Sequence, residues 1–541
     1  MIDAVRIQSM PGITPLYQDY IYRYREVSEF YNGDFRDENA YQRVNERVLS
    51  RRLPRRQLAE ILKEQNQSYG CGKKTLENID ALMGDDACAV VTGQQVGLFS
   101  GPLYTIYKSL TAILLSEHLK QNLRGRVVPV FWLASDDHDF AEINHMVLLN
   151  KKNQIEKICY QPEVTSDKVP AAKIFFTSEI QSCIQRLEEL THDSEFKQEV
   201  LAHLSEAYQQ GRTFPEAFAI WMTRLFKSYG LVFMDATHPG LKDLGKKVFW
   251  QEIAESSPST QLGLEASERL SRAGYGAQVQ LHEGVLNLFM GEQERKAIQI
   301  RGSDFIVKNT RLIYEKNDIL DLVEKEPQVF SPNVLLRSLY QDTLLPTVAY
   351  VGGPSEIAYF AQMKGIYEKF GLPMPVIYPR KTVTLVENTI ANLCNRYELH
   401  VQDVWKKGDL IFNEAARKQI PDSFQEVIQD TAEHLKKNLA FLKQDMTALD
   451  PTLGKIADAS FWKIDGQLKF LERKVVQASK KRNAVATRQL QKVKNNLYPA
   501  GRLQERVFNI TPFLMKYSHS FIGDLYRTID RETYDHQIIR L

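Results

Sequence analysis

Short apolar runs alternate with amphipathic stretches through the middle of the chain. Five runs end in turn residues and have the length of buried strands: 89–94, 127–134, 231–236, 347–352 and 375–380. Between the first two lies LYTIYKSLTAILLSEHLKQ, whose apolar residues recur at helical spacing. A strand, a loop, a helix and a second strand in this order begin a doubly wound sheet. The pattern predicts an α/β fold with a Rossmann-like parallel sheet as its core.

The five predicted strands are too far apart in the chain for one uninterrupted sheet domain. We therefore expect two connecting insertions, the second with short antiparallel strands in GAQVQLHEGVLNLFMG and AIQIRGSDFIVKN. The first 85 residues indicate helices, with Pro54 between two of them. The predicted order is N-terminal helices and the first half of the core over 1–150, an insertion over 151–205, more core over 206–258, the second insertion over 259–335, the last core strands over 336–385, and a helical domain over 386–541.

The helical domain contains a predicted antiparallel hairpin over 423–497. Apolar residues step by three and four in both arms, from Leu435 to Leu449 and from Phe461 to Val475, which is typical of a coiled coil. The second arm, about 455–497, is longer than the first. The apolar residues of the second arm that extend past the first arm must pack against another element to be buried: Val485, Leu490, Val493 and Leu497. The helix 502–528 could cover some of them and a second copy the rest, so we expect a homodimer through the hairpin; the alternative is a monomer whose own core covers the arm.

Net charge, hydropathy and cysteine content narrow the binding partners, the cellular compartment and the metal sites that we expect. The 541 residues include 69 Lys and Arg against 67 Asp and Glu, a net charge of +2, so we expect no nucleic-acid partner. No run of about 18 apolar residues and no secretory signal is present, so we expect no membrane span. The five cysteines are scattered, and none is in a CxxC pair. This pattern favours a reduced cytoplasm and no structural zinc.

The first candidate site is the loop Gly93–Pro102, which follows a buried strand and begins a helix. Free N–H groups at a helix start favour an anion such as phosphate. Phosphate contacts are predicted for its glycines: Gly93, Gly97 and Gly101. Substrate contacts are predicted for the neighbouring polar side chains: Gln94, Gln95 and Tyr104. Lys108 is placed to reach the anion and is a candidate catalytic residue. The alternative is a tight turn with Lys108 in solvent, since the loop is neither GxGxxG nor a P-loop.

The second candidate is Ser135-Asp136-Asp137-His138-Asp139, at the end of the next strand. His138 can move a proton near neutral pH, with Asp137 as its catalytic companion. Asp136 and Asp139 are predicted to bind the substrate, for example an amine or a ribose. Neighbouring residues cannot all face one ion, so no metal site is expected. The alternative is a polar helix cap.

A third group follows the strand 347–352. Nucleotide contacts are predicted for Gly352, Gly353, Ser355 and, after the last strand, Arg380. Substrate contacts are predicted for Glu356 and, upstream in NVLLRSLYQD, for Asn333 and Arg337. Because parallel strands end at one edge of their sheet, we expect all three groups to share one ligand cleft.

These sequence motifs together resemble those of the bacillithiol-biosynthesis cysteine-adding enzyme family, BshC. The resemblance covers essentially the whole chain and rests on TGQQVGLFSGPLYTIYK, PVFWLASDDHDFAEIN, NVLLR followed by LPTVAYVGGPSEIAYF, MPVIYPR and LYPAGRLQER. It implies a Rossmann core, two connecting insertions and a C-terminal coiled coil. It also implies a cysteine ligase that adds cysteine to the amine of glucosaminyl-malate, the last step of bacillithiol biosynthesis.

Such a ligase needs an activated carboxyl group, so we expect ATP or another nucleotide, with Mg²⁺ left open. Asp136, Asp137 or Asp139 would hold the cysteine ammonium, and His138 would accept a proton. Lys108 and Arg380 would stabilise negative charge in the transition state. Two alternatives stay open: a nucleotidyltransferase or glycosyltransferase on the same fold, and a non-catalytic nucleotide-binding dimer.

Overall fold

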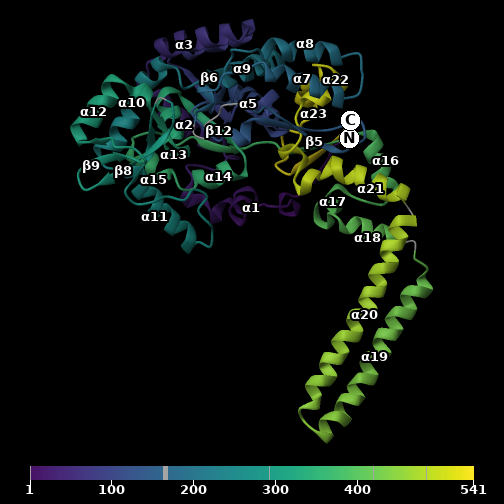
Figure 1. Ribbon diagram of the computed structural model, residues 1–541. Helices are drawn as coiled ribbons and strands as arrows, with labels where there is room; N and C mark the ends of the chain where they lie inside the picture. The colour runs from purple at the N-terminus through teal and green to yellow at the C-terminus, as the bar shows by residue number, and fades with distance from the viewer. Residues whose placement is uncertain (1, 163–168, 292, 418–419, 483) are drawn as a thin grey trace. The chain divides into compact units, whose positions relative to one another are not determined.

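The computed structural model describes residues 2–541 except 163–168, 292, 418–419 and 483. The chain divides into two compact units (Figure 1). The first comprises 1–385 and 504–539, and the second comprises 386–503 and 540–541. The predicted helical domain over 386–541 differs from this division, because 504–539 packs within the first unit.

A five-stranded parallel sheet forms the core of the first unit, and the predicted strands are confirmed. Its strands, in spatial order, are β13 (Val376–Pro379), β12 (Thr347–Gly352), β2 (Ala87–Gln94), β3 (Arg126–Leu133) and β6 (Val232–Asp235). Every neighbouring pair is parallel. Nearly all residues of these strands are buried, as expected when helices cover both faces of a parallel sheet.

Helices from several parts of the chain pack on this sheet. α5 (Leu103–Asn122) packs against β2 and β3, and the N-terminal helices α2 (Glu38–Leu49), α3 (Arg55–Ser68) and α4 (Lys73–Leu82) pack against β12, β6 and β3. Pro54 separates α2 from α3, as predicted. The other helices around the core are α1 (Pro15–Tyr22), α9 (Phe214–Phe226), α10 (Pro239–Ala254), α13 (Val334–Leu344), α14 (Pro354–Phe360) and α15 (Lys364–Lys369).

The two insertions carry their own small sheets. The first begins with the hairpin β4 (His145–Leu149) and β5 (Ile155–Cys159), followed by α7 (Glu179–Leu190) and α8 (Lys197–Ala207). The second contains α11 (Pro258–Arg272), α12 (Lys316–Lys325) and five antiparallel-paired strands: β7 (Val285–Met290), β8 (Lys296–Arg301), β9 (Asp304–Val307), β10 (Ile313–Tyr314) and β11 (Phe330–Pro332). The antiparallel prediction is confirmed from Val285 onward, while 276–284 forms no strand.

The two ends of the chain lie side by side in a small sheet that the sequence pattern missed (Figure 1). β1 (Ile2–Val5) pairs antiparallel with β15 (His536–Arg540), which lies beside β14 (Val383–Val386). The side-chain amide of Gln504 bonds both the N–H and the carbonyl oxygen of Leu385. These contacts hold the segment 504–539, with α22 (Thr511–Tyr517) and α23 (Phe521–Thr528), in the first unit.

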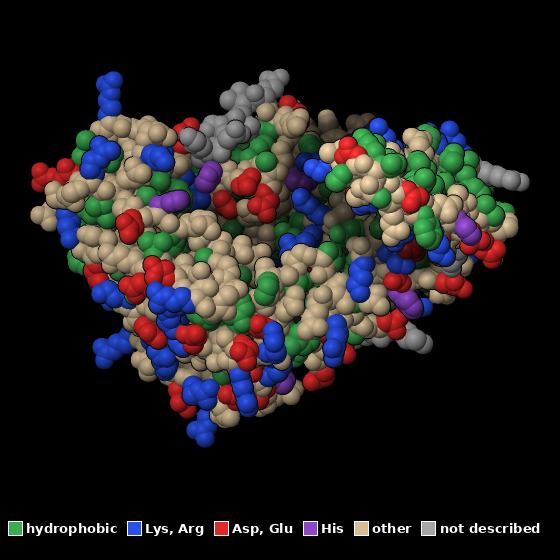
Figure 2. Space-filling model, turned by 90° about the horizontal axis from the view of Figure 1, so that it is seen from below, with side chains coloured by type: hydrophobic (Ala, Val, Ile, Leu, Met, Phe, Trp, Pro, Cys, Tyr) green, Lys and Arg blue, Asp and Glu red, His purple; other side chains and the backbone are tan. Residues whose placement is uncertain are grey.

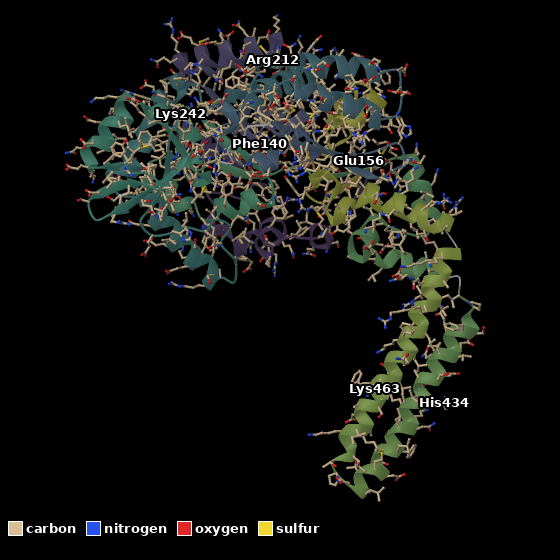
Figure 3. All side chains as sticks on the ribbon, in the orientation of Figure 1. Phe140, Glu156, Arg212, Lys242, His434 and Lys463 are labelled. Carbon is tan, nitrogen blue, oxygen red and sulfur yellow. The ribbon has the colours of Figure 1, made fainter. Side chains whose placement is uncertain are left out.

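The second unit is helical, and the predicted coiled-coil hairpin is confirmed as α19 (Asp422–Leu449) and α20 (Leu453–Arg482). His434 and Lys463 mark its two arms in Figure 3. α21 (Ala484–Leu497) follows, and Asn483, inside the predicted second arm, lies outside the described residues. The remaining helices are α16 (Asn388–Arg396), α17 (Val401–Lys407) and α18 (Leu410–Arg417).

The predicted need for a second copy to cover the long arm is wrong for most of its residues. Leu490, Val493 and Leu497 are buried on α21, which packs against α16, α17 and α18. Leu490 belongs to a cluster with Ile411 and Phe412. Val485 alone of the four stays exposed. The sequence could not show this because the covering helices lie about 70 to 100 residues earlier in the chain.

The surface agrees with the balanced composition. Basic and acidic side chains are interspersed over the face that Figure 2 shows. Among the described residues, no helix combines the length and the apolar character that crossing a membrane requires.

Candidate active site

The carboxyl edge of the parallel sheet opens into a cavity of about 540 Å³, within the usual range for small-molecule sites. Its walls come from the segments that follow β2, β3 and β12, together with α13 and the second insertion. The predicted residues that line it are Gly93, Gln94, Gln95, Tyr104, Lys108, Asp136, Asp137, His138, Asn333, Arg337, Gly353, Ser355, Glu356 and Arg380. The expected convergence of three strand-end loops is therefore confirmed.

Lys108 is buried at the back of this cavity and is held by three groups. Its ammonium lies 2.5 Å from a carboxylate oxygen of Glu356 and donates to the carbonyl oxygen of Gly93 and the side chain of Gln94. Burial lowers the pKa of Lys108, with Glu356 opposing. Burial would raise the pKa of Glu356, but Lys108 and the N–H of Gly353 outweigh it and lower that pKa. The result is a buried ion pair, so the alternative of a solvated Lys108 is wrong.

Gly97 and Gly101 do not line the cavity, which corrects the predicted phosphate site at the start of α5. The N–H of Leu103 donates to the carbonyl oxygen of Phe508, and the buried amide of Asn509 donates to the carbonyl oxygens of Phe99 and Gly101. The chain's own backbone thus occupies the helix start. A Cβ on Gly97 would lie 2.9 Å from the Cα of Gly101, so close packing of the loop explains that glycine.

Contacts within the sheet account for Gly93 and Gly352, the glycines at the ends of two of its strands for which phosphate or nucleotide contacts are predicted. A Cβ on Gly93 would lie 2.9 Å from the carbonyl oxygen of Trp132 on the neighbouring strand. Gly93 lines the cavity, but packing within the sheet is enough to require a glycine there. Gly352 ends β12 and its carbonyl oxygen accepts from the N–H of Arg380, so it lies behind the cavity wall.

The acidic loop after β3 divides into groups with different partners. Asp136 pairs at 2.8 Å with Lys242, a fully buried lysine of α10 (labelled in Figure 3) whose pKa burial lowers. Asp137 accepts a 2.6 Å hydrogen bond from Gln95 and caps the N–H of His138. Asp139 is exposed and caps the short helix α6 (Phe140–Ile143), so its predicted substrate role is corrected to a helix cap.

His138 lies at the cavity wall with an arginine beside it. Its Nδ1 is 3.3 Å from a guanidinium nitrogen of Arg295, and its ring contacts Phe289 edge-on. Arg295 is buried and also donates to Ser331 and to the carbonyl oxygen of Pro332. Because a ring nitrogen of a neutral imidazole can accept a proton, His138 is a candidate general base at this wall.

The predicted polar face of α13 meets α14 at the cavity. Arg337 donates at 2.8 Å to the hydroxyl of Tyr359 and also bonds Gln341. Asn333 caps α13 by accepting from the N–H groups of Leu335 and Leu336. Arg337 therefore points a cation toward the pocket from a fixed position.

The predicted nucleotide contact of Arg380 is also corrected, because its guanidinium is paired within the protein. Both of its terminal nitrogens bond the carboxylate of Glu505, at 2.6 and 3.0 Å, and both side chains are almost fully buried. Burial alone would raise the pKa of Glu505, yet Arg380 lowers it. A guanidinium held in this way stabilises the fold of 504–539 and is not open to phosphate. The neighbouring Arg506 is exposed and lines the cavity.

Sequence reasoning missed several residues of the site: Glu142, Lys242, Phe289, Arg295, Tyr350, Tyr359 and Arg506. Lys242 follows the predicted strand 231–236 by one short turn, so its place at the sheet edge was a usable signal. Arg295 and Arg506 come from the second insertion and from the segment after the helical domain, and nothing in their local sequence indicates the cavity.

The fold and the cavity define the class of this protein. A Rossmann-like parallel sheet carries, at its carboxyl edge, a pocket with an imidazole, carboxylates and arginines in contact with one another. This is the arrangement of an α/β enzyme with a small-molecule site.

Comparison with known proteins identifies the family. Residues 2–381 match the Bacillithiol biosynthesis BshC N-terminal Rossmann-like domain, and 383–541 match the BshC C-terminal coiled-coil domain. A protein of Salinibacter ruber named "Putative cysteine ligase BshC" is 36% identical, covering 97% of this chain and 96% of its own. One of Chloroherpeton thalassium with the same name is 34% identical over 95% and 93% of the two chains. The chain belongs to the BshC family.

Proposed function

We propose that this protein is an ATP-dependent ligase that joins cysteine to the amine of glucosaminyl-malate, the last step of bacillithiol biosynthesis. The observation that carries the proposal is that His138, Asp137, Arg295 and Arg337 line one and the same cavity. The family and the name of its members supply the substrate class.

The reaction needs two steps because a free carboxylate does not acylate an amine. An oxygen of the cysteine carboxylate first attacks a phosphorus of ATP, giving an acyl-adenylate and pyrophosphate, or an acyl phosphate and ADP. The sugar amine then attacks the acyl carbon, the amide bond forms, and AMP or phosphate leaves with the bonding electron pair. The amine loses one proton in this step, which His138 is positioned to accept.

The contacts of each side chain suggest its role. Asp137, whose carboxylate accepts from Gln95 and lies 3.7 Å from Arg295 at the cavity wall, would bind the cysteine ammonium. Arg337 and Arg506 line the cavity and would face the phosphates or the malate carboxylates. Lys108 is a positioning residue, because its ammonium is fully engaged with Glu356, Gly93 and Gln94.

A Mg²⁺ ion would enter with the nucleotide. Asp136 and Glu356 are each paired with a buried lysine, and Asp137 is assigned to the cysteine ammonium, so Glu142 is the cavity carboxylate best placed to meet such an ion. Activity that persists in excess EDTA would remove Mg²⁺ from the proposal.

The test incubates the full-length protein with ATP, cysteine and glucosaminyl-malate and follows thiols by mass spectrometry. Bacillithiol formed with stoichiometric AMP supports an acyl-adenylate, and bacillithiol formed with ADP supports an acyl phosphate. Nucleotide transfer to the sugar without amide formation would identify a nucleotidyltransferase, and glycosyl transfer would identify a glycosyltransferase. Nucleotide binding that neither cysteine nor sugar affects would identify a non-catalytic dimer.

We also propose that the chain forms a homodimer through α19 and α20. The side chains left more than half exposed on this hairpin include Val427, Phe441, Leu442, Leu449, Ile456, Trp462 and Leu471. Two helices alone cannot bury so many apolar groups, and full burial of one such side chain contributes about 1.5–3 kcal/mol. A second copy of the same hairpin is the simplest cover.

A further inference from the structure

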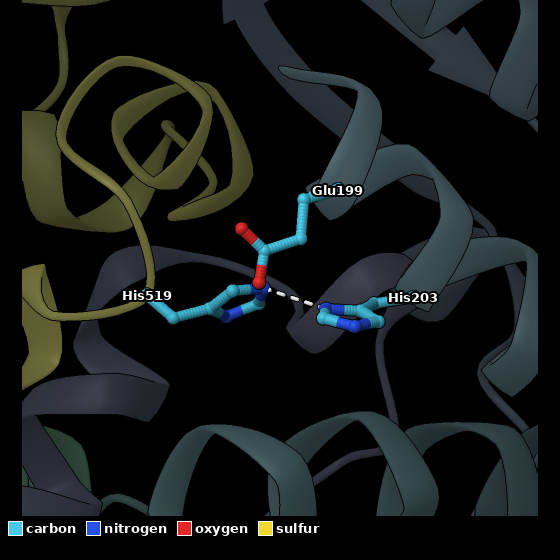
Figure 4. A group of neighbouring side chains, drawn as sticks. All are labelled: Glu199, His203 and His519. Carbon is cyan, nitrogen blue, oxygen red and sulfur yellow. Dashed lines mark hydrogen bonds between the residues drawn. The ribbon is translucent and has the colours of Figure 1, made fainter. Parts of the chain in front are cut away.

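Two histidines and a glutamate meet in the first unit, away from the residues that line the cavity. Glu199 and His203 lie one turn apart on α8, and His519 lies in the short connection between α22 and α23. The Nδ1 of His203 is 2.8 Å from the Nε2 of His519. Figure 4 shows the Glu199 carboxylate directed at this nitrogen pair.

The donor atoms are close enough to share one ion. One ligand atom from each side chain lies within 4.8 Å of the other two. Ligands at about 2.0–2.1 Å from a tetrahedral zinc lie roughly 3.3 Å apart. The imidazole nitrogens would open by about half an ångström and the carboxylate would close on them, which side-chain rotation allows. Residues at i and i+4 present their side chains on the same face of a helix, so α8 supplies two of the ligands.

The groups packed around the two imidazoles come from α8 and α9. Burial lowers the pKa of both histidines, and for His519 the neighbouring His203 adds to this effect. The nearby charges are Glu199 and Glu206 of α8 and Arg224 of α9, and Arg224 is itself paired with Glu206. The ring of Trp221, also on α9, contacts His519 edge-on. Neutral histidine and ionised glutamate are the ligand forms that zinc requires.

We propose that Glu199, His203 and His519 form a Zn²⁺ site. Water would complete a tetrahedral shell, since three protein ligands leave one position open. The ion would connect the first insertion to the C-terminal segment, whose ligand lies 316 residues further along the chain. The ion would fasten the α22–α23 connection to α8, where α22 already packs. The expectation of no structural zinc considered only cysteine spacing, and these ligands are histidine and carboxylate.

The test titrates Zn²⁺ into chelator-treated full-length protein by calorimetry, with thermal unfolding as a second readout. We expect one Zn²⁺ per chain at micromolar affinity or tighter, and a higher melting temperature with zinc. His203→Ala and His519→Ala should each weaken binding by at least about 10-fold. Co²⁺ in the same site should show the visible absorption of a tetrahedral complex, and that absorption should be lost in both variants.

Three variants keep the result interpretable. Glu199→Gln changes an exposed residue, so it should fold normally and still weaken binding. His434→Ala removes an exposed histidine of α19 and should leave affinity unchanged. Cys71→Ser tests whether a partly exposed thiol binds the ion instead. Unchanged stoichiometry and affinity in the folded His203→Ala, His519→Ala double variant would overturn the proposal, as would no binding at micromolar zinc.

Discussion

At the scale of single residues, the candidate site separates groups held in buried ion pairs from groups that face the cavity. Asp136, Lys108 and Glu356 have buried, oppositely charged partners. His138 and Asp137 are partly exposed at the cavity wall, where Asp137 accepts from Gln95 and lies 3.7 Å from the buried Arg295, which also contacts His138. Substitutions in the two sets should therefore separate stability from turnover.

His138→Ala should lower kcat by about 100-fold or more and leave the melting temperature nearly unchanged, because it removes a proton acceptor and little packing. Ligase kinetics and thermal unfolding measure the two effects. His192→Ala, at an exposed position of the same unit, is the matched control. A large loss of melting temperature with normal kcat would show that His138 is a structural cap.

Lys108→Met and Glu356→Gln should each destabilise the fold by about 3–5 kcal/mol, because each leaves one buried charge without its partner. Urea unfolding of both single variants and of the double variant gives their coupling. The double variant should be more stable than the sum of the two losses predicts. Additive losses would mean that the 2.5 Å contact contributes no coupling.

At the scale of elements, the segment 504–509 fixes both the last strand and the start of α5. Glu505 binds Arg380 after β13 and also accepts from the N–H of Val383, at the start of β14. Phe508 and Asn509 close the loop before α5. The cavity therefore depends on residues 504–509, which come after residues 386–503 of the second unit in the chain.

Lowering the pH should test the ion pair between Arg380 and Glu505, because Arg380 lowers the pKa of Glu505. A lowered pKa in the folded state adds stability above the ordinary glutamate pKa, and this stability is lost as the pH falls from about 5 toward 3. Urea midpoints across this range should fall in the wild type. Glu505→Gln should be less stable at pH 7 and should show a smaller fall. An identical pH dependence in both proteins would remove Glu505 from this role.

At the scale of the whole molecule, α19 and α20 expose apolar side chains that their own packing does not cover. Sedimentation equilibrium should find a dimer at micromolar concentration. Phe441→Glu and Trp462→Glu should shift it to monomer by placing charges in the apolar contact, while Lys436→Glu, an exposed charge change on the same hairpin, should not. A monomeric wild type would contradict the dimer.

The sequence by itself determined the five strands of the parallel sheet, the presence of two insertions and the coiled-coil hairpin. Apolar runs that end in turn residues depend on local burial, and a step of three and four depends on local helix geometry. It also placed His138, Asp137 and Glu356 at one sheet edge, because parallel strands end together.

Only the tertiary structure decided which polar groups are free to act. The partners of Arg380 and of the α5 start come from 505–509, more than a hundred residues away. The helices α16, α17 and α18 cover the long arm of the hairpin, and the proposed zinc ligands come from α8 and from the connection between α22 and α23. Ion pairs and cavities depend on distances across the folded chain, which a local pattern of residues does not contain.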